Sequence, residues 1–459
     1  MAKSAEATRP GDRTAGEVWD ETHRQLTIGL IATVSMTAFE AMAVATVLPA
    51  TVADIGGVTW YGWAFSAFML ANLVGTSVCG RMADQRGAAP PFVMGVTLFV
   101  GGLLGAGISP TMPLLVLGRA AQGFGAGAIS SIGYLAVARA YAPNARPRMM
   151  ALLSSAWVVP GLIGPAVAGT IADHLSWRWI FLGLAPISVA AAGWTTPALR
   201  RLGPSGASEA PDRTLTALRL AVGAGAALFA LDGHSIMVAA PLVAAGLVIG
   251  TPALRELVPH GTLRAAGGPP AAIAALALVS AAFFGTEAFL PLSLTSLRGQ
   301  STTVAGLTLT AATLSWTTGA WVQARLAARI SRRSVALAGL ALTLTGIAGV
   351  AVIVSPAAPV LVAPVSWGIS GMGMGLAYST LVLEALEGAS AGQEGETSAA
   401  VQLGNVLGIA MGTGLAGATL TFASASWSHA AGLAMVGCLT VGLAVAALLT
   451  GFRLSRGDR

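Results

Sequence analysis

Long apolar segments alternate with short polar ones along nearly the whole chain. A transmembrane helix needs about 20 predominantly apolar residues. Fourteen segments fit this length, near 26–52, 59–80, 91–108, 113–137, 148–171, 177–198, 215–233, 236–254, 268–292, 303–324, 334–354, 358–384, 398–422 and 428–451. The pattern predicts an all-α polytopic membrane protein with 14 spans, grouped as six, two and six.

The polar segments divide these spans into units. We expect a cytoplasmic tail over 1–25, a six-helix bundle over 26–198, a linker with two accessory transmembrane helices over 199–264, a second six-helix bundle over 265–452 and a tail over 453–459. The first tail is polar and has no apolar stretch typical of a cleavable signal peptide.

The composition supports a membrane protein. Charged residues make up 10% of the 459 residues and hydrophobic residues 55%, whereas soluble domains carry roughly 25% charged residues. An ordinary soluble enzyme and a disordered chain are therefore excluded. Cys79 and Cys438 both lie in apolar segments, so neither a disulfide framework nor a cysteine metal site is expected. The chain has no phosphate-binding loop motif, and we expect no cofactor.

The net charge of +6 reflects topology rather than a nucleic-acid partner. Arginines that fall on one side of the predicted membrane are Arg81, Arg86, Arg139, Arg146, Arg148, Arg200, Arg201, Arg213, Arg255, Arg264, Arg329, Arg332, Arg333, Arg453, Arg456 and Arg459. The other side holds Arg178 and Arg298, and we place Asp54 and Asp173 in its loops. Because basic residues favour the cytoplasmic side, we predict an integral plasma (inner) membrane protein with both termini cytoplasmic.

One predicted inner loop is acidic instead. Glu384, Glu387, Glu394 and Glu396 have no basic residue beside them in the sequence. This loop is either a solvated surface or a partner for a basic cytoplasmic loop in one conformational state.

The two six-helix units are weakly related in sequence. Gly75, Arg81 and Gly95 recur at one constant offset as Gly319, Arg325 and Gly339. Parallel six-helix repeats are typical of transporters.

A charged loop follows the second span. Gly80 and Gly87 permit a tight turn, and Asp84 near a helix N-terminus could cap that helix and complement its dipole. With Arg86, this loop would form a latch on the cytoplasmic side. The alternative is an ordinary basic loop with a turn.

The fifth span combines glycines with a proline. Pro165 permits a kink, and Gly161, Gly164 and Gly169 allow a neighbouring helix to approach closely. Generic helix packing explains these glycines equally well.

Three charged residues stand out within the spans. Arg119, followed by Gln122, would cost ~2.5–3.5 kcal/mol at mid-helix, so it faces a partner or a cavity, or snorkels to the interface. Glu40 lies almost midway along the first span, where an ionised carboxylate is costly and a proton can bind near neutral pH. Glu287 is either a second such site or an interfacial carboxylate.

Aromatic and amide side chains within the spans are candidates for a substrate cavity, because flat rings accept varied apolar and cationic ligands. They are Trp63, Phe68, Asn72, Gln122, Trp157, Trp316, Tyr378 and Asn405. Taken singly, each also fits lipid-facing or core packing.

These motifs together resemble the major facilitator superfamily, and more narrowly its fourteen-helix drug:proton antiporter branch. The charged loop at 80–87, Arg119 with Gln122, and the glycines around Pro165 carry the resemblance, and Glu40 stands nine residues before Pro49 as the branch's acidic residue does. The resemblance implies two six-helix bundles that alternate access to a midplane cavity. It implies proton coupling through Glu40 and Arg119, and export of small amphipathic or drug-like molecules. Expected partners are that substrate, protons and membrane lipids, and the protein is expected to be a monomer.

Two other functions remain open from the sequence. One is a proton-coupled symporter that takes up a small metabolite on the same fold, against which the proline-glycine pattern of the fifth span argues. The other is a lipid-handling or sensor membrane protein, in which the accessory helices would serve a lipid or partner role.

Overall fold

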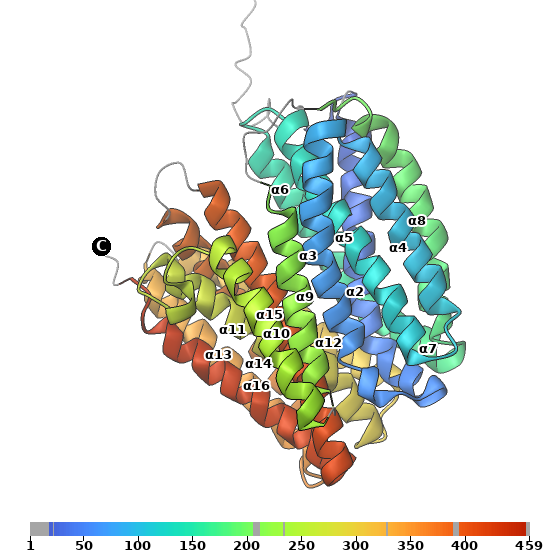
Figure 1. Cartoon of the computed structure of the whole chain (residues 1–459), viewed down its shortest axis with the longest axis vertical. Helices are drawn as coiled ribbons and strands as arrows, with labels where there is room; N and C mark the ends of the chain where they lie inside the picture. The colour runs from blue at the N-terminus through green and yellow to red at the C-terminus, as the bar shows by residue number, and fades with distance from the viewer. Residues whose placement is uncertain are drawn as a thin grey trace, which may run out of the picture.

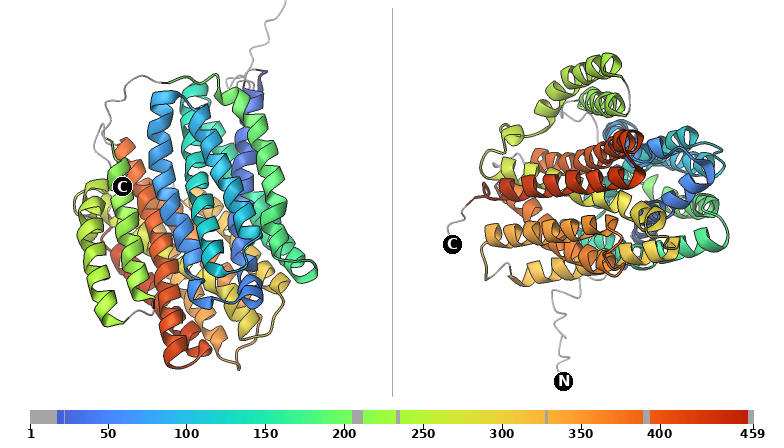
Figure 2. Two further views of the ribbon diagram at one scale, coloured as in Figure 1. Left: turned by 45° about the vertical axis from the view of Figure 1, so that its right-hand side comes forward. Right: turned by 90° about the horizontal axis from the view of Figure 1, so that it is seen from below.

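The structure, a computed structural model, describes residues 18–21, 23–204, 212–232, 235–326, 329–388 and 394–455. Throughout this part of the chain the regular secondary structure is helical. The long helices run side by side in two bundles, with a pair of further helices packed on their outside (Figures 1 and 2).

The first bundle contains α2 (Arg24–Ile55), α3 (Trp63–Arg86), α4 (Ala89–Gly107), α5 (Met112–Ala140), α6 (Arg146–Ser155), α7 (Val158–His174) and α8 (Arg178–Leu199), with the 3-10 turn η1 (Val58–Trp60) before α3. The outside pair is α9 (Thr214–Leu231) and α10 (Ile236–Leu257), followed by η2 (Thr262–Arg264). The second bundle contains α11 (Pro269–Ser296), α12 (Thr302–Leu326), α13 (Arg332–Ala351), η3 (Val352–Val354), α14 (Val362–Glu387), α15 (Glu394–Ser426) and α16 (His429–Gly451).

Twelve helices of the described chain are long and apolar enough to cross a membrane. The helices α5 and α12, of 29 and 25 residues, are not among these 12. α5 contains many glycines and two arginines, α12 contains many threonines, and both pack between other helices of their bundle. The length and hydropathy of the helices therefore support 12 of the 14 predicted spans.

The predicted fifth span is broken into α6 and α7. Pro160 has no backbone N–H, so the carbonyl of Ala156 one turn earlier loses its helical donor. The hydroxyl of Ser35 on α2 donates to this carbonyl at 3.0 Å. The break therefore leaves no unsatisfied acceptor at Ala156, and it ties α2 to the α6–α7 junction.

Three glycines of α5 bring its backbone against its neighbours. A Cβ added at Gly123 would lie 2.0 Å from the carbonyl oxygen of Phe68, and one at Gly127 would lie 2.2 Å from that of Asn72. On the adjacent face, a Cβ at Gly125 would lie 2.3 Å from the carbonyl oxygen of Gly95. The helices α3, α4 and α5 are thus in contact at a distance that only glycine allows.

The second bundle repeats this packing with α14 in the place of α5. Gly371 and Gly375 face the carbonyl oxygens of Ala312 and Trp316 on α12, and Gly373 faces that of Gly339 on α13. Gly339 is the sequence counterpart of Gly95, so the repeated glycines occupy equivalent contacts. The repeat in the sequence therefore reflects a repeat in the fold.

The two ends of the molecule differ in charge. We call the end that carries Arg86, Arg139, Arg332 and Arg453 the basic end, and the end that carries Asp173 the distal end. The axes of the two bundles diverge toward the basic end and converge toward the distal end (Figure 1).

Direct contacts join the bundles in the distal half. The Cα of Gly417 on α15 lies 2.8 Å from the position of a Cβ built on Gly62, just before α3. One turn further, Ser66 bonds the carbonyl of Ala410 at 2.9 Å and the hydroxyl of Thr413 at 3.0 Å. The hydroxyl of Tyr61 donates to the carbonyl of Ala288 on α11 at 2.8 Å. These contacts close the distal end between α3 and the second bundle.

The helices α9 and α10 form a pair that lies over the junction of the bundles (Figure 2). They are in backbone contact, because a Cβ at Gly223 would lie 2.7 Å from the carbonyl oxygen of Gly246. Leu228 of α9 packs in one cluster with Leu70 of α3 and Ala410 of α15. The accessory pair therefore touches both bundles rather than one.

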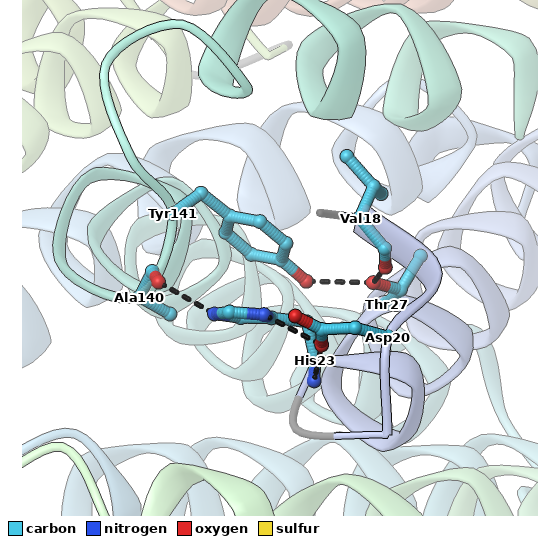
Figure 3. Close-up of polar contacts among 6 residues, drawn as sticks. All are labelled: Val18, Asp20, His23, Thr27, Ala140 and Tyr141. Carbon is cyan, nitrogen blue, oxygen red and sulfur yellow. Dashed lines mark hydrogen bonds and ion pairs between the residues drawn. The ribbon is translucent and has the colours of Figure 1, made fainter. Parts of the chain in front are cut away.

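A polar cluster at the basic end fastens the start of α2 to the end of α5 (Figure 3). The ring of His23 contacts the carboxylate of Asp20 at 2.8 Å and the carbonyl of Ala140 at 2.9 Å. Beside it, the hydroxyls of Tyr141 and Thr27 are 2.8 Å apart. The carbonyl of Ala140 is one of the last in α5, and His23 therefore satisfies an acceptor that the helix cannot.

The glycine contacts give a test of this fold. We expect Gly123→Ala to lower the melting temperature of the detergent-solubilised protein by several degrees, because overpacking a close contact costs about 1–3 kcal/mol. The matched control is Gly101→Ala on α4, where nothing lies within 4 Å of an added Cβ. The control should melt at the same temperature or slightly higher. Equal melting of the two variants would contradict the backbone contact between α3 and α5.

Candidate functional site

A buried ion pair lies at the centre of the first bundle. The guanidinium of Arg119 on α5 donates through Nη1 to Oε1 of Glu40 on α2. Glu40 is 0% exposed and Arg119 is 2% exposed. Arg119 therefore points to a partner inside the protein and does not snorkel to an interface.

Two further groups hold the same guanidinium. Its Nε donates to the carbonyl of Ala64 on α3 at 3.0 Å, and its Nη1 also donates to the side-chain oxygen of Gln122. The ring of Phe68 on α3 lies beneath it, 4.3 Å from the guanidinium carbon to the ring centroid. Arg119 thus links α2, α3 and α5 with a geometry that leaves the side chain little freedom.

The pair still contains groups with no bonding partner. Oε2 of Glu40 and Nε2 of Gln122 are buried and make no hydrogen bond within the described chain. An unpaired buried acceptor costs about 1–3 kcal/mol. Oε2 is therefore the atom on which a proton would bind, and protonation would remove the charge that holds Arg119.

Glu287 stands apart from this pair. It lies on α11 of the second bundle, partly exposed, and makes no hydrogen bond or ion pair with the described residues. Phe284 and Pro291 lie about one helical turn to either side of it. The structure therefore gives two carboxyls in different bundles, one paired and one without a partner.

Aromatic rings gather on the second bundle beside α11. Trp316 lies 5.4 Å from Phe283, 6.3 Å from Phe284 and 5.7 Å from Tyr378, measured between ring centroids. Phe283 stacks in turn on Trp367, with centroids 4.4 Å apart. Two of the predicted cavity residues, Trp316 and Tyr378, are thereby brought together from α12 and α14.

The other predicted cavity residues are dispersed. Phe68 and Gln122 belong to the Arg119 site. On the second bundle, the side-chain oxygen of Asn405 accepts a hydrogen bond from Ser280 at 2.8 Å. Trp157, at the α6–α7 break, is 47% exposed, and Asn72 is partly exposed on α3.

Trp63 lies elsewhere than expected. Its Nε1 donates to Asp232 at 3.2 Å, and its ring meets that of Phe229 edge-on with centroids 6.2 Å apart. Both partners belong to α9 and the residue that follows it. Trp63 therefore holds the accessory helices to α3, a contact that a span-by-span interpretation of the sequence does not predict.

The charged loop after α3 differs in detail from the expectation. The helix continues to Arg86, so Asp84 lies in its last turn and not at a helix N-terminus. Asp84 forms an ion pair with Arg139 of α5 at 2.6 Å. Gly87 takes the left-handed φ of +83° that ends α3. A Cβ added at Gly80 would lie 3.1 Å from the hydroxyl of Ser131, and the side chain of Arg86 is exposed.

The glycines around Pro165 line the contact between α7 and the second bundle. A Cβ at Gly161 would lie 2.3 Å from Thr313 on α12, and one at Gly169 would lie 2.7 Å from the backbone of Thr302. The carbonyl of Pro165 faces Gly306 of α12 at a similarly close approach, whereas Gly164 faces Phe39 of α2. This segment is therefore an interface between the bundles.

A carboxylate that sequence analysis assigned to a loop completes this interface. Asp173, in the last turn of α7, accepts from the backbone N–H groups of Thr302 and Thr303 at 3.1 and 2.9 Å and from the hydroxyl of Thr303 at 2.7 Å. It therefore caps the N-terminus of α12 from the opposite bundle. No local sequence signal identified this contact, because other helices of the described chain lack an acidic residue in their first turn just as α12 does.

Charged pairs at the basic end connect the linker to both bundles. Arg81 of α3 pairs with Asp212 at 2.9 Å, and Arg213 pairs with Glu396 of α15. The backbone N–H of Thr214 donates to Asp212 and is the main reason that the pKa of Asp212 lies below its usual value. In this conformation Glu396 of the acidic loop thus has a basic partner from the linker.

Comparison with known proteins places the chain among transporters. The family model described as Major Facilitator Superfamily matches residues 29–413. A protein named "Probable multidrug-efflux transporter" from Mycobacterium tuberculosis is 29% identical over 436 residues, which is 90% of each chain. Multidrug transporter protein MdtP of Bacillus subtilis is 23% identical over 410 residues, covering 86% of this chain and 75% of that protein.

Solved structures share the fold. A peptide transporter of the POT family superposes with a TM-score of 0.69 at 13% identity, over 94% of this chain and 97% of that one. A bacterial homolog of the human lysosomal transporter Spinster, in an inward-facing and unoccupied conformation, superposes with a TM-score of 0.68 at 12% identity over the same shares.

A double-mutant cycle tests the ion pair. Removing one member of a buried pair leaves an uncompensated charge and costs about 3–5 kcal/mol, whereas removing both costs much less. We therefore expect Glu40→Gln and Arg119→Gln to destabilise singly, and the double variant to be more stable than their sum by about 2–3 kcal/mol. The free energy of unfolding in a denaturant titration measures this coupling. Additive effects would show that Glu40 and Arg119 do not interact.

Proposed function

Because this chain belongs to the Major Facilitator Superfamily, we propose that it exports small amphipathic or drug-like molecules by alternating access, driven by a proton gradient. The family and the relatives are transporters and not enzymes, so the chain is an integral membrane transporter that binds small-molecule substrates. The two relatives described above are named for multidrug transport, which supports export over the uptake of a metabolite.

The observation that carries the proposal is the buried pair of Glu40 and Arg119. A proton on Oε2 of Glu40 neutralises the carboxylate, and the guanidinium then loses its counter-charge. Arg119 also holds the carbonyl of Ala64 on α3. In the same stretch of chain, Gly62 and Ser66 contact α15 of the other bundle. Protonation therefore acts two residues away from the contacts that close the distal end.

Orientation follows from the arginines. Their concentration at the basic end supports a cytoplasmic placement of that end, and of both termini, in the plasma (inner) membrane. With the distal end closed and the bundles diverging toward the basic end, the conformation is inward-facing. We place α5 and α12 across the membrane as well, because 29 and 25 helical residues exceed the roughly 20 that a span requires. This gives 14 spans in a monomer surrounded by lipid.

Substrate would bind between the bundles. The ring cluster around Trp316 and Tyr378 offers flat apolar surface, and Glu287 on the neighbouring helix offers a carboxyl with no competing partner among the described residues. Asn72, Trp157 and Asn405 would complete the lining. In this proposal the first bundle carries the proton and the second carries most of the substrate contact, with Glu287 as a second titrating or binding group.

Replacement of Glu40 tests the coupling. In inverted vesicles or whole cells, we expect Glu40→Gln to abolish dye efflux that depends on a proton gradient, while energy-independent dye exchange across the membrane persists. The control is Glu256→Gln on α10, whose carboxylate accepts from Thr216 within the accessory pair and should be dispensable for coupling. Undiminished gradient-driven efflux in the Glu40→Gln variant would remove Glu40 from the mechanism.

Replacement of Asp173 tests the distal closure. Asp173→Ala removes three hydrogen bonds to α12, and a bond to a charged group contributes about 1.5–3 kcal/mol. The probe is a cysteine in place of buried Thr46, in a chain otherwise free of cysteine. We expect this cysteine to react with an impermeant maleimide at least about fivefold faster in the Asp173→Ala variant than in the chain that retains Asp173. Asp54→Ala is the matched control, since Asp54 bonds Trp177 and Arg178 of its own bundle at 3.0 and 2.5 Å. Equal acceleration in both variants would argue against a latch between bundles.

A further inference from the structure

A cavity at the basic end lies outside the proposed transport site. It has a volume of about 320 Å³, is open to the surface, and is lined by η2, the first half of α11 and the end of α16. Arg264 and Arg453 are the charged residues of its lining, and Leu263, Leu278 and Leu449 contribute apolar surface. A volume of this size suits a small ligand or a lipid headgroup.

The polarity of the cavity is graded with depth. Leu278 lies nine residues after the first residue of α11, which corresponds to about 14 Å along the helix. Arg264 and Arg453 lie instead in η2 and just beyond α16, at the level where the helices end. Apart from Leu263, which lies beside Arg264 in η2, the lining therefore changes from cationic at the helix ends to apolar toward the middle of the bundle.

The two arginines are arranged to receive an anion. Nη1 of Arg453 donates to the carbonyls of Arg264 and Ala265 at 2.7 and 3.4 Å, which fixes this guanidinium against the turn. The side chain of Arg264 is exposed and bonds to no other described residue. None of the residues that line the cavity is acidic. Two guanidinium groups in the lining of one cavity, with no acidic residue in that lining, attract an oxyanion, and phosphate suits their planar geometry.

The turn that carries these groups is conformationally costly. Ala265 has a left-handed φ of +47° and ψ of +48°, and among the described residues it is the non-glycine residue with positive φ. The turn is held by hydrogen bonds from Ala265 to Thr262 and from Ala266 to Gly261, both 3.0 Å. Residues held in this region of the Ramachandran map occur preferentially at ligand clamps, and this one forms part of the cavity wall.

We propose that this cavity binds the phosphate of an anionic phospholipid, with Arg264 and Arg453 contacting the phosphate and the leucine walls receiving the start of an acyl chain. The graded lining favours a lipid over free phosphate, because free phosphate would leave the apolar half unused. Basic pockets between membrane helices on the cytoplasmic side recognise anionic headgroups in this way. The site does not depend on the proposed transport function.

A bound lipid would bridge two parts of the chain. Arg264 belongs to the connection that follows α10, and Leu449 and Arg453 belong to the end of α16. The phosphate would replace mutual repulsion of the two guanidinium groups by attraction to a shared anion. The lipid would thereby fasten the accessory helices to the second bundle, in addition to the contacts that α9 makes with α3 and α15.

Thermal melting of the full chain in detergent tests the site. We expect phosphatidylglycerol to raise the melting temperature by several degrees in a saturable manner, since a ligand of the folded state stabilises it by mass action. Phosphatidylcholine at equal concentration should have little effect. Arg264→Gln should weaken the apparent affinity for phosphatidylglycerol about tenfold, and Arg264→Lys should retain more of it. Because the Arg264 side chain bonds to no other described residue, these variants should melt normally without lipid.

The control variant is Arg200→Gln, which removes an exposed arginine at the same end of the first bundle. Its response to phosphatidylglycerol should match that of the unaltered chain. Inorganic phosphate is the second probe. If it stabilised the chain as strongly as phosphatidylglycerol, the ligand would be free phosphate and the lipid proposal would fail. The absence of any phosphatidylglycerol effect, or an equal loss in Arg200→Gln and Arg264→Gln, would also overturn it.

Discussion

The ion pair between Glu40 and Arg119 constrains the whole first bundle. Removing two charges from water costs several kcal/mol per ion, and their attraction offsets this cost only when the geometry is close and further hydrogen bonds are made. Here the further bonds come from Ala64 and Gln122. Ala64 reaches Arg119 because α5 lies in backbone contact with α3, which the glycine at position 123 permits, and Gln122 lies about one turn along α5 itself. The glycines of α5 and the buried pair are therefore parts of one arrangement.

Among the described residues, the second bundle has the same glycine packing but no ion pair at the position of Glu40 and Arg119. Its glycines Gly371 and Gly375 repeat the contacts of α5, but the position four residues before the first of them is Trp367, where the first bundle has Arg119. Trp367 stacks on Phe283 of α11, so an aromatic contact joins α14 to α11 where an ion pair joins α5 to α2. The two halves share a backbone plan but differ in chemistry, with a titratable centre in the first and an aromatic centre in the second.

Much of the fold could be predicted from the sequence because hydropathy directly reports helices in a membrane. The helix order, the accessory pair and the conspicuous positions of Glu40 and Arg119 all follow from apolar length and the rarity of charge. Contacts between distant segments could not be predicted in the same way. The local sequence allows Trp63 to face either a cavity or α9. It also allows Asp173 either to be solvated or to cap α12. The prediction that Asp84 lies near a helix N-terminus was wrong for a related reason, because α3 continues past Asp84 to Arg86. Hydropathy predicts whether a residue lies in a buried span, but the partner of its side chain depends on how the helices pack, which only the structure shows.

Two of the contacts that close the distal end differ in chemistry, and this difference bears on how a proton could drive transport. Between α3 and α15 the contact is neutral, formed by glycines and by the hydroxyls of Ser66 and Thr413. Between α7 and α12 it is ionic, formed by Asp173 at a helix N-terminus. A ligand shifts a conformational equilibrium only by the difference in its affinity for the two states. Glu40, the proposed proton site, is connected to the neutral contact through Arg119 and Ala64, whereas Asp173 belongs to the contact between α7 and α12. In the proposed mechanism Asp173 therefore contributes to the energy of the closed state, and Glu40 supplies the proton-dependent change that opposes it.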